Sequence, residues 1–203
     1  MLRRAFRGRL CSMPVSLKAF ISYSWTSPAF VERVRTLADR LRQDGIDVLL
    51  DQYDLGLGDD KFVYMQKSVS DPSVKKVIVL CDARYKEKFD NRQGGVGTES
   101  TMMTSDIYDQ AGGNQTANNK FVAIPFSNIV TTPDGIERHL EKPEDVLPIA
   151  IRNLMYINMW TDKDLEEQYV SLLHFLTDTP QRVKPPLGKL PSFLNSPSIF
   201  LGS

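Results

Sequence analysis

Lys76-Val-Ile-Val-Leu-Cys81 is the most apolar strand pattern in the chain. Its apolar residues do not alternate with polar ones, which is typical of a central strand in a parallel sheet with helices on both faces. Asp82 and Ala83 follow at the carboxyl end of the run. We therefore expect a parallel sheet built around this strand. The chain then leads to Glu99, which we expect near the carboxyl edge of the sheet, where open α/β sheets bind ligands.

A unit of strand, helix and strand precedes the Lys76–Cys81 strand in the sequence. Lys18–Tyr23 predicts a short buried strand, and Ile46–Leu50 predicts a second one that ends at Asp51. Between them Ser27 is a suitable helix cap, with Pro28 at the first helical position. The apolar residues of this helix share one face: Phe30, Val34, Leu37, Ala38 and Leu41. Such a crossover is right-handed and makes its two strands parallel.

The remaining elements extend the same alternation. After the loop Gln52–Asp60, a helix is expected over Asp60–Val69. Further strands are expected at Phe121–Phe126 and Leu154–Met159, and a last amphipathic helix at Asp162–Leu176. Five strands alternating with helices predict an α/β, flavodoxin-like three-layer fold with a five-stranded, mostly parallel sheet.

The two ends of the chain differ from this pattern. Residues 1–16 form a basic extension with four arginines, and we expect it to be disordered. Residues 178–203 are rich in proline, which predicts an extended tail or linker and suggests a sensor or partner domain beyond it. The folded domain is expected to span residues 17–177.

The amino-acid composition argues against several classes of function. Lysine plus arginine equals aspartate plus glutamate at 25 each, so nothing favours nucleic-acid binding. No apolar run approaches the roughly 18 residues of a membrane span. Two separate cysteines favour a reducing, cytoplasmic setting. His139 and His174 are far apart in sequence, so we expect no metal and no bound cofactor.

A glycine-rich turn, Gly94-Gly-Val-Gly-Thr-Glu99-Ser100, carries the candidate catalytic group. Gly97 permits close backbone approach by a ligand, and Thr98 is a suitable cap for a helix that begins there. Glu99 would then lie in the first helical turn, where the helix dipole favours its ionised form. Improving the helix terminus is the alternative role for this carboxylate.

Four motifs in order resemble a known family. They are Lys18-Ala-Phe-Ile-Ser-Tyr-Ser24, Asp51 with its glycine loop, Val77–Cys81 followed by Tyr85, and the turn that ends at Glu99. Together they resemble a bacterial Toll/interleukin receptor (TIR) domain of the SEFIR-like branch over about residues 17–177. A phosphoacceptor receiver domain shares this architecture but needs an acidic pair where this chain has Ser22-Tyr23-Ser24.

The resemblance implies an activity and a site. Many bacterial TIR domains cleave NAD+ at the nicotinamide glycosidic bond, and Glu99 matches the catalytic glutamate. Tyr23, Ser24, Trp25, Asp51 and Gly97 would bind the substrate. The loop after the second strand would act in assembly into homo-oligomers and would comprise Tyr53, Asp54, Leu55, Gly56, Leu57 and Gly58.

Two functions stay open at this point. The first is an NAD+ glycohydrolase or ADP-ribose cyclase in bacterial antiviral defence, activated by self-association. The second is a non-enzymatic module for homotypic protein interaction. Many TIR domains carry Trp-Cys before the glutamate, whereas this chain has Gly-Gly-Val-Gly-Thr, which fits the SEFIR-like branch and keeps the second reading in play.

Overall fold

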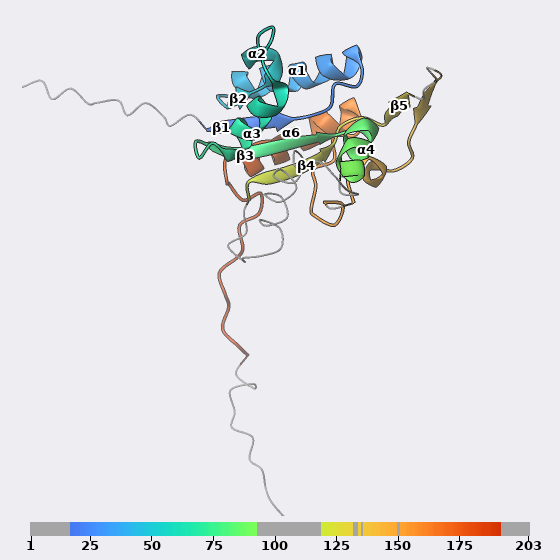
Figure 1. Cartoon of the computed structure of the whole chain (residues 1–203). Helices are drawn as coiled ribbons and strands as arrows, with labels where there is room; N and C mark the ends of the chain where they lie inside the picture. Colours follow the sequence, from blue (N-terminus) through green and yellow to red (C-terminus); the bar gives the residue numbers. More distant parts are fainter. Residues whose placement is uncertain (1–16, 93–118, 132–133, 135, 150, 192–203) are drawn as a thin grey trace, which may run out of the picture.

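The structure is a computed structural model that describes residues 17–92, 119–131, 134, 136–149 and 151–191 (Figure 1). The predicted basic extension 1–16, Gly97, Glu99 and the helix expected from Thr98 lie outside the described residues.

The core of the described chain is a four-stranded parallel sheet with the order β2-β1-β3-β4. The strands are β1 (Lys18–Ser22), β2 (Asp47–Leu49), β3 (Val74–Cys81) and β4 (Phe121–Pro125). In register, Ile78 of β3 lies opposite Ile21 of β1, and Val79 of β3 lies opposite Ala123 of β4. The predicted parallel sheet with a central third strand is confirmed.

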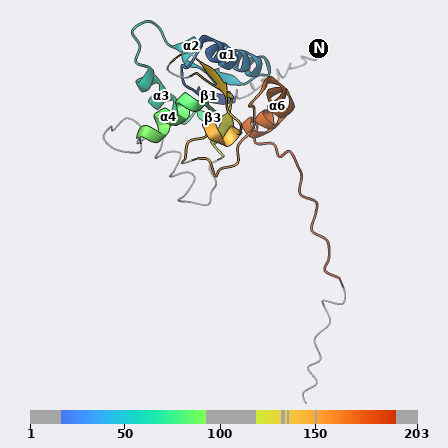
Figure 2. The ribbon, with the colours of Figure 1, turned by 90° about the vertical axis from the view of Figure 1, so that its right-hand side faces the viewer.

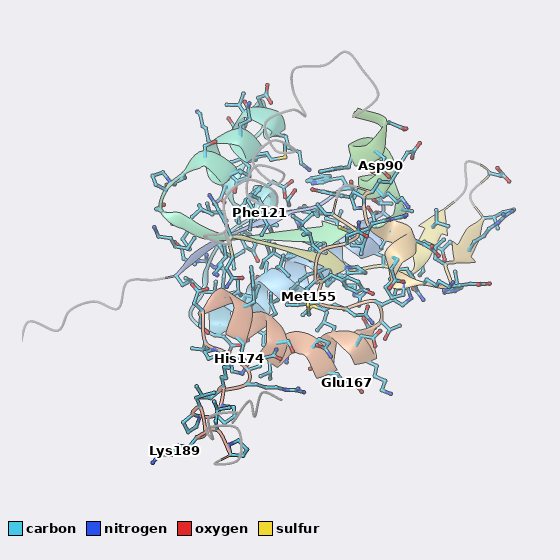
Figure 3. The ribbon with its side chains drawn as sticks, turned by 90° about the horizontal axis from the view of Figure 1, so that it is seen from below. Asp90, Phe121, Met155, Glu167, His174 and Lys189 are labelled. Carbon is cyan, nitrogen blue, oxygen red and sulfur yellow. The ribbon has the colours of Figure 1, made fainter. Side chains whose placement is uncertain are left out.

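Helices cover both faces of this sheet. They are α1 (Pro28–Gln43), α2 (Asp51–Asp54), α3 (Lys61–Ser70), α4 (Ala83–Arg92), η1 (Pro143–Val146) and α6 (Asp162–Leu176). One core cluster joins the sheet to α1 and α6, and a second joins it to α3, α4 and η1. Figure 2 shows α1 and α6 on the other side of the sheet from α3 and α4. In Figure 3, Glu167 and His174 mark α6 on one side and Asp90 marks α4 on the other.

Strand β3 explains the two layers. Ile78 and Leu80 pack into the cluster with α1 and α6, whereas Val77, Val79 and Cys81 pack into the cluster with α3 and α4. Successive side chains of a strand point to opposite faces, so an unbroken apolar run requires a cover on each face. All five side chains are at most 1% exposed.

Caps fix where the two longest helices begin. The Ser27 hydroxyl accepts a hydrogen bond from the Phe30 amide, and Pro28 opens α1 as predicted. Thr161 and Asp164 form a reciprocal capping box at the start of α6. Both helices then bury one apolar face, in α1 the five residues predicted from the spacing.

Two expectations about secondary structure were wrong. Leu154–Met159 is not a fifth strand, although the amides of Ile157 and Met159 donate to carbonyls of β4, so this segment covers the edge of β4 without a regular ladder. The predicted loop after β2 begins with a short helix, α2. Other elements had not been predicted: helix α4 follows β3, and a small antiparallel sheet, β5 (Ile129–Thr131) with β6 (Glu137–His139), follows β4.

A buried lysine ties the end of α6 to the sheet. The Lys76 ammonium group is nearly inaccessible to solvent, donates to the Asn119 carbonyl and forms an ion pair with Asp178, just beyond α6. Asp178 adopts a φ of 53°, which is uncommon for a residue with a side chain. Backbone hydrogen bonds that end α6, from the Asp178 amide to the Phe175 carbonyl and from the Thr179 amide to the His174 carbonyl, accompany this conformation, and the ion pair anchors the Asp178 side chain to the sheet. Beyond it, residues 179–191 are exposed and contain no helix or strand.

We expect Asp178→Asn to lower the free energy of unfolding by about 1–3 kcal/mol, because it removes the anionic partner of a buried ammonium group while tolerating positive φ. Lys76→Met should cost less, since it removes the buried charge itself. Urea denaturation of both variants tests this. A larger loss for Lys76→Met than for Asp178→Asn would contradict it.

Candidate functional site

The carboxyl ends of the parallel strands gather polar side chains at one edge of the sheet. Tyr23 to Thr26 follow β1, Asp51 lies two residues beyond β2, and Asp82 directly follows β3. Parallel strands place all their carboxyl ends together, which is why residues 56 or 63 positions apart in sequence meet here. The side chains at this edge form two groups of hydrogen bonds and ion pairs, one around Asp51 and one around Asp82.

The first group is centred on the Asp51 carboxylate, which is 6% exposed. Its Oδ1 accepts a hydrogen bond from the Tyr23 hydroxyl at 2.7 Å. Its Oδ2 accepts one from the Trp25 indole N–H at 2.9 Å and pairs with the Lys61 ammonium at 2.7 Å. Three donors, one of them charged, compensate a carboxylate that has lost most of its water.

Tyr23 is fixed from two directions. Its hydroxyl donates to Asp51 and accepts from the Gln52 side-chain amide at 2.9 Å. Burial, and then the adjacent Asp51 carboxylate, raise the pKa of the Tyr23 phenol above its ordinary value. The phenol therefore stays protonated at neutral pH and keeps donating to Asp51.

Lys61 lies against two aromatic rings as well as a carboxylate. Its Nζ is 4.5 Å from the centroid of the Trp25 ring and 5.2 Å from that of Tyr23. Both distances are within the range of cation–π attraction. Trp25 is 53% exposed, so part of its ring surface is open to solvent. We call Tyr23, Trp25 and Asp51 the aromatic–acid cluster.

The second group is centred on Asp82, which is 2% exposed. Its carboxylate accepts hydrogen bonds from the Thr26 hydroxyl and from the Tyr85 amide, the latter at 2.7 Å. The Tyr85 hydroxyl in turn lies 3.3 Å from the Ser22 hydroxyl. Asp82 therefore ties the loop after β1 to the first turn of α4.

The Asp82 carboxyl has a shifted pKa because it is buried. Burial raises its pKa above the ordinary value of 3.8, and the hydrogen bonds from Thr26 and Tyr85 oppose that shift only in part. At neutral pH its ionised form costs stability, because the folded state disfavours the charge.

The loop between α2 and α3 is anchored at both ends and exposed in the middle. The Tyr53 hydroxyl donates to Asp39, and the Tyr64 hydroxyl donates to Asp54. Leu57, by contrast, is fully exposed, and Gly58 follows with a φ of 92° that favours glycine. Figure 2 shows this loop projecting from the body of the domain. The loop thus exposes the apolar Leu57 side chain to solvent, while hydrogen bonds hold the helices at both of its ends.

Of the residues predicted to bind substrate, Tyr23, Trp25 and Asp51 come together in the aromatic–acid cluster. Ser24 lies between the first two in sequence and is buried. Gly97 and the predicted catalytic Glu99 lie outside the described residues, so their roles stay predictions. Of the predicted assembly loop, Tyr53 and Asp54 belong to α2, while Leu55 and Gly56 follow it, with the Gly56 amide donating to Asp59 at 2.7 Å.

Two members of the site were not predicted as such. Lys61 begins α3, ten residues after Asp51, and no spacing rule brings them together. Thr26 carried no signal in the sequence except its position shortly after β1. Its hydrogen bond to Asp82 depends on how the loop after β1 folds back toward β3. Asp82 itself carried a signal, since it follows the most apolar strand.

Comparison with known proteins agrees with this architecture. The model of the SEFIR domain family matches residues 17–138. A solved structure described as the crystal structure of a prokaryotic SEFIR domain is 32% identical, and the match covers 86% of this chain and 100% of that chain with a TM-score of 0.60. A comparison with curated protein sequences gave no match.

The fold and these matches define a TIR-like signalling or interaction module. The chain belongs to the SEFIR domain family, as the four sequence motifs predicted. Among the described residues, no helix is both long enough and apolar enough to cross a membrane.

We expect Asp82→Asn to change the pH dependence of stability. The folded pKa of Asp82 lies above 3.8, so the folded state binds this proton more tightly than the unfolded chain. Wild-type stability should therefore fall relative to Asp82→Asn as the pH rises from below 3.8 through the folded pKa.

Thermal unfolding between pH 3 and 8 measures this difference. Asp71→Asn is the opposite control, because hydrogen bonds from Ser73 lower the pKa of Asp71. The wild type should gain stability relative to Asp71→Asn as the pH rises. Parallel curves for the wild type and Asp82→Asn would refute the assignment.

Proposed function

We propose that this SEFIR domain is an NAD+ glycohydrolase activated by self-association. The bond between the nicotinamide nitrogen and C1′ of the ribose breaks, and its electron pair stays with nicotinamide. Water adds to C1′ and loses a proton, so NAD+ and water give nicotinamide, ADP-ribose and a proton. Attack by a group of the adenine instead of water would give a cyclic ADP-ribose.

The observation that carries the proposal is the aromatic–acid cluster at the carboxyl edge of the sheet. Nicotinamide in NAD+ is a flat, cationic ring. A partly open indole face, a second ring fixed by hydrogen bonds and a buried carboxylate are the groups that attract such a ring. Open α/β sheets bind ligands at this edge.

Glu99 is the proposed catalytic residue. Nicotinamide departs as a neutral molecule, so no general acid is needed, unlike ordinary glycoside hydrolysis. One carboxylate suffices to bind the ribose hydroxyls and stabilise the positive charge that develops at C1′. The sequence supports this role, because glycines directly before Glu99 are the residues that permit close backbone approach by a ligand.

Self-association is proposed to act through the loop between α2 and α3. Leu57 is fully exposed, and Tyr53 is 39% exposed although its hydroxyl is held by Asp39. Burying an exposed leucine against a second copy contributes about 1.5–3 kcal/mol. A shared site between neighbouring copies would make turnover depend on protein concentration.

The same exposed loop also favours a second candidate function. A SEFIR domain that assembles through Leu57 without cleaving NAD+ would act as a homotypic interaction module. In both cases the proposed setting is cytoplasmic bacterial immune signalling, with a sensor or partner domain reached through the proline-rich tail. Turnover of NAD+ separates the two candidates.

We expect Glu99→Gln to lower the rate of NAD+ consumption about 10²- to 10³-fold, as when a preorganised electrostatic group is removed. Release of nicotinamide from concentrated protein, followed by chromatography, measures this. Glu87→Gln is the matched control, because Glu87 is an exposed acid on α4. Assembly without any NAD+ loss in the wild type would favour the interaction module.

We expect Leu57→Asp to abolish concentration-dependent oligomers while leaving the melting temperature unchanged, because a fully exposed side chain contributes little to folding. Sedimentation velocity over a range of concentrations measures assembly. Leu187→Asp is the control, since Leu187 is equally exposed but lies in the tail. Equal loss of assembly in both variants would argue against the loop.

A further inference from the structure

The Lys61 ammonium group occupies the aromatic–acid cluster in the way that a bound organic cation would. It pairs with the Asp51 carboxylate at 2.7 Å and lies 4.5 Å and 5.2 Å from the ring centroids of Trp25 and Tyr23. A carboxylate with two aromatic faces is a general recognition set for quaternary nitrogen and other organic cations. The chain therefore contains both a cation site and its own occupant.

We propose that Lys61 is a removable internal plug, and that the aromatic–acid cluster binds a planar organic cation of the pyridinium class when Lys61 leaves. Naming the nicotinamide ring of NAD+ as this cation rests on the proposed function. The cation site itself does not, because it follows from the contacts of Lys61.

Charge balance explains why one cation should replace another. Asp51 is 6% exposed, and its two neutral donors, Tyr23 and Trp25, leave its negative charge uncompensated. Removing Lys61 without replacement would leave a buried, unpaired carboxylate, which is costly. A pyridinium ring restores the positive charge. A neutral ring of the same shape does not, so the site should select for charge.

The exposure of the partners explains how the exchange can occur. The Lys61 side chain is 48% exposed, so its ammonium can move into water without opening the core. Trp25 is 53% exposed and gives a ligand access from solvent. Tyr23 is 8% exposed and forms the buried side of the cation site, where hydrogen bonds with Asp51 and Gln52 hold its hydroxyl in place.

The position of Lys61 in the chain links the plug to assembly. It is the first residue of α3 and directly follows the loop that carries the exposed Leu57 and Gly58. In the proposal, contact of a second copy with Leu57 would displace the segment that leads into Lys61. Contact between copies would in this way withdraw the plug, so that an isolated domain stays closed and an assembled one opens.

Lys61→Gln tests the plug directly. Glutamine removes the charge but keeps an N–H group that can donate to Asp51, and Lys61→Arg is the matched control that keeps the charge. The probes are 1-methylnicotinamide, a pyridinium cation with a methyl group in place of the ribose and so without a glycosidic bond, and neutral nicotinamide. NMR titration of the Trp25 indole N–H, assigned with Trp25→Phe, reports binding because this N–H donates to Asp51.

The proposal expects Lys61→Gln to bind 1-methylnicotinamide about tenfold more tightly than the wild type or Lys61→Arg, and about tenfold more tightly than nicotinamide. Adding Asp51→Asn, which removes the buried negative charge but keeps the Trp25 indole as reporter, should abolish the gain. Equal affinities in wild type and Lys61→Gln, or equal gains for both probes, would overturn it.

A second measurement uses the wild-type protein and does not depend on the stability of a variant. Acetylation of lysines, read by mass spectrometry, should become faster at Lys61 with saturating 1-methylnicotinamide, because the displaced ammonium enters solvent. Lys163, whose side chain is 82% exposed, is the internal reference. Unchanged reactivity of Lys61 at saturation would overturn the proposal.

The outcomes also separate this inference from the proposed function. Cation binding in Lys61→Gln with no NAD+ turnover under any condition leaves the cation site standing and removes the enzyme. Turnover that depends on Glu99, with no gain of cation binding, keeps the enzyme and removes the plug.

Discussion

Burial of β3 on both faces is the constraint on which the rest of the structure depends. Its backbone groups need partners on both sides, which β1 and β4 supply, and its apolar side chains need a helical layer above and below. Two helical layers require crossovers that make the strands parallel, and parallel strands end at one edge. The polar residues after β1, β2 and β3 are therefore brought together by the same requirement that buries Val77 and Ile78.

Asp51 shows how such an edge becomes a site. A carboxylate that is nearly excluded from water must be compensated, and here two neutral donors and one ammonium group compensate it. The neutral donors, Tyr23 and Trp25, come from residues directly after β1. The ammonium comes from Lys61, which is half exposed and begins a helix after a projecting loop. The groups that stabilise the acid thus divide into two neutral donors beside β1 and one half-exposed cation, and the proposed link between ligand recognition and assembly rests on this division.

Local patterns predicted the regular elements where burial is simple. The apolar spacing in Pro28–Gln43 and the cap at Ser27 gave a helix whose buried residues were those expected. Prediction failed where tertiary contacts replaced regular pairing. Leu154–Met159 has the composition of a strand. It forms no regular ladder, and only the amides of Ile157 and Met159 donate hydrogen bonds to carbonyls of β4. Lys61 was missed because a charged residue at a helix start is usually solvated, and only the fold places it over two rings.

The sequence by itself determined the order of the four sheet strands and of helices α1, α3 and α6, the parallel sheet and the family, because apolar periodicity, caps and short motifs are local properties that neighbouring residues specify. Only the tertiary structure decided which polar residues share a site. Asp51 meets Tyr23 and Trp25 across 26 or more positions, and Asp82 meets Thr26 across 56. Such contacts depend on strand order and loop path, and neither is encoded in the spacing of residues along the chain. The compensation of a buried charge is a property of the folded surroundings, so it is readable only once those surroundings are known.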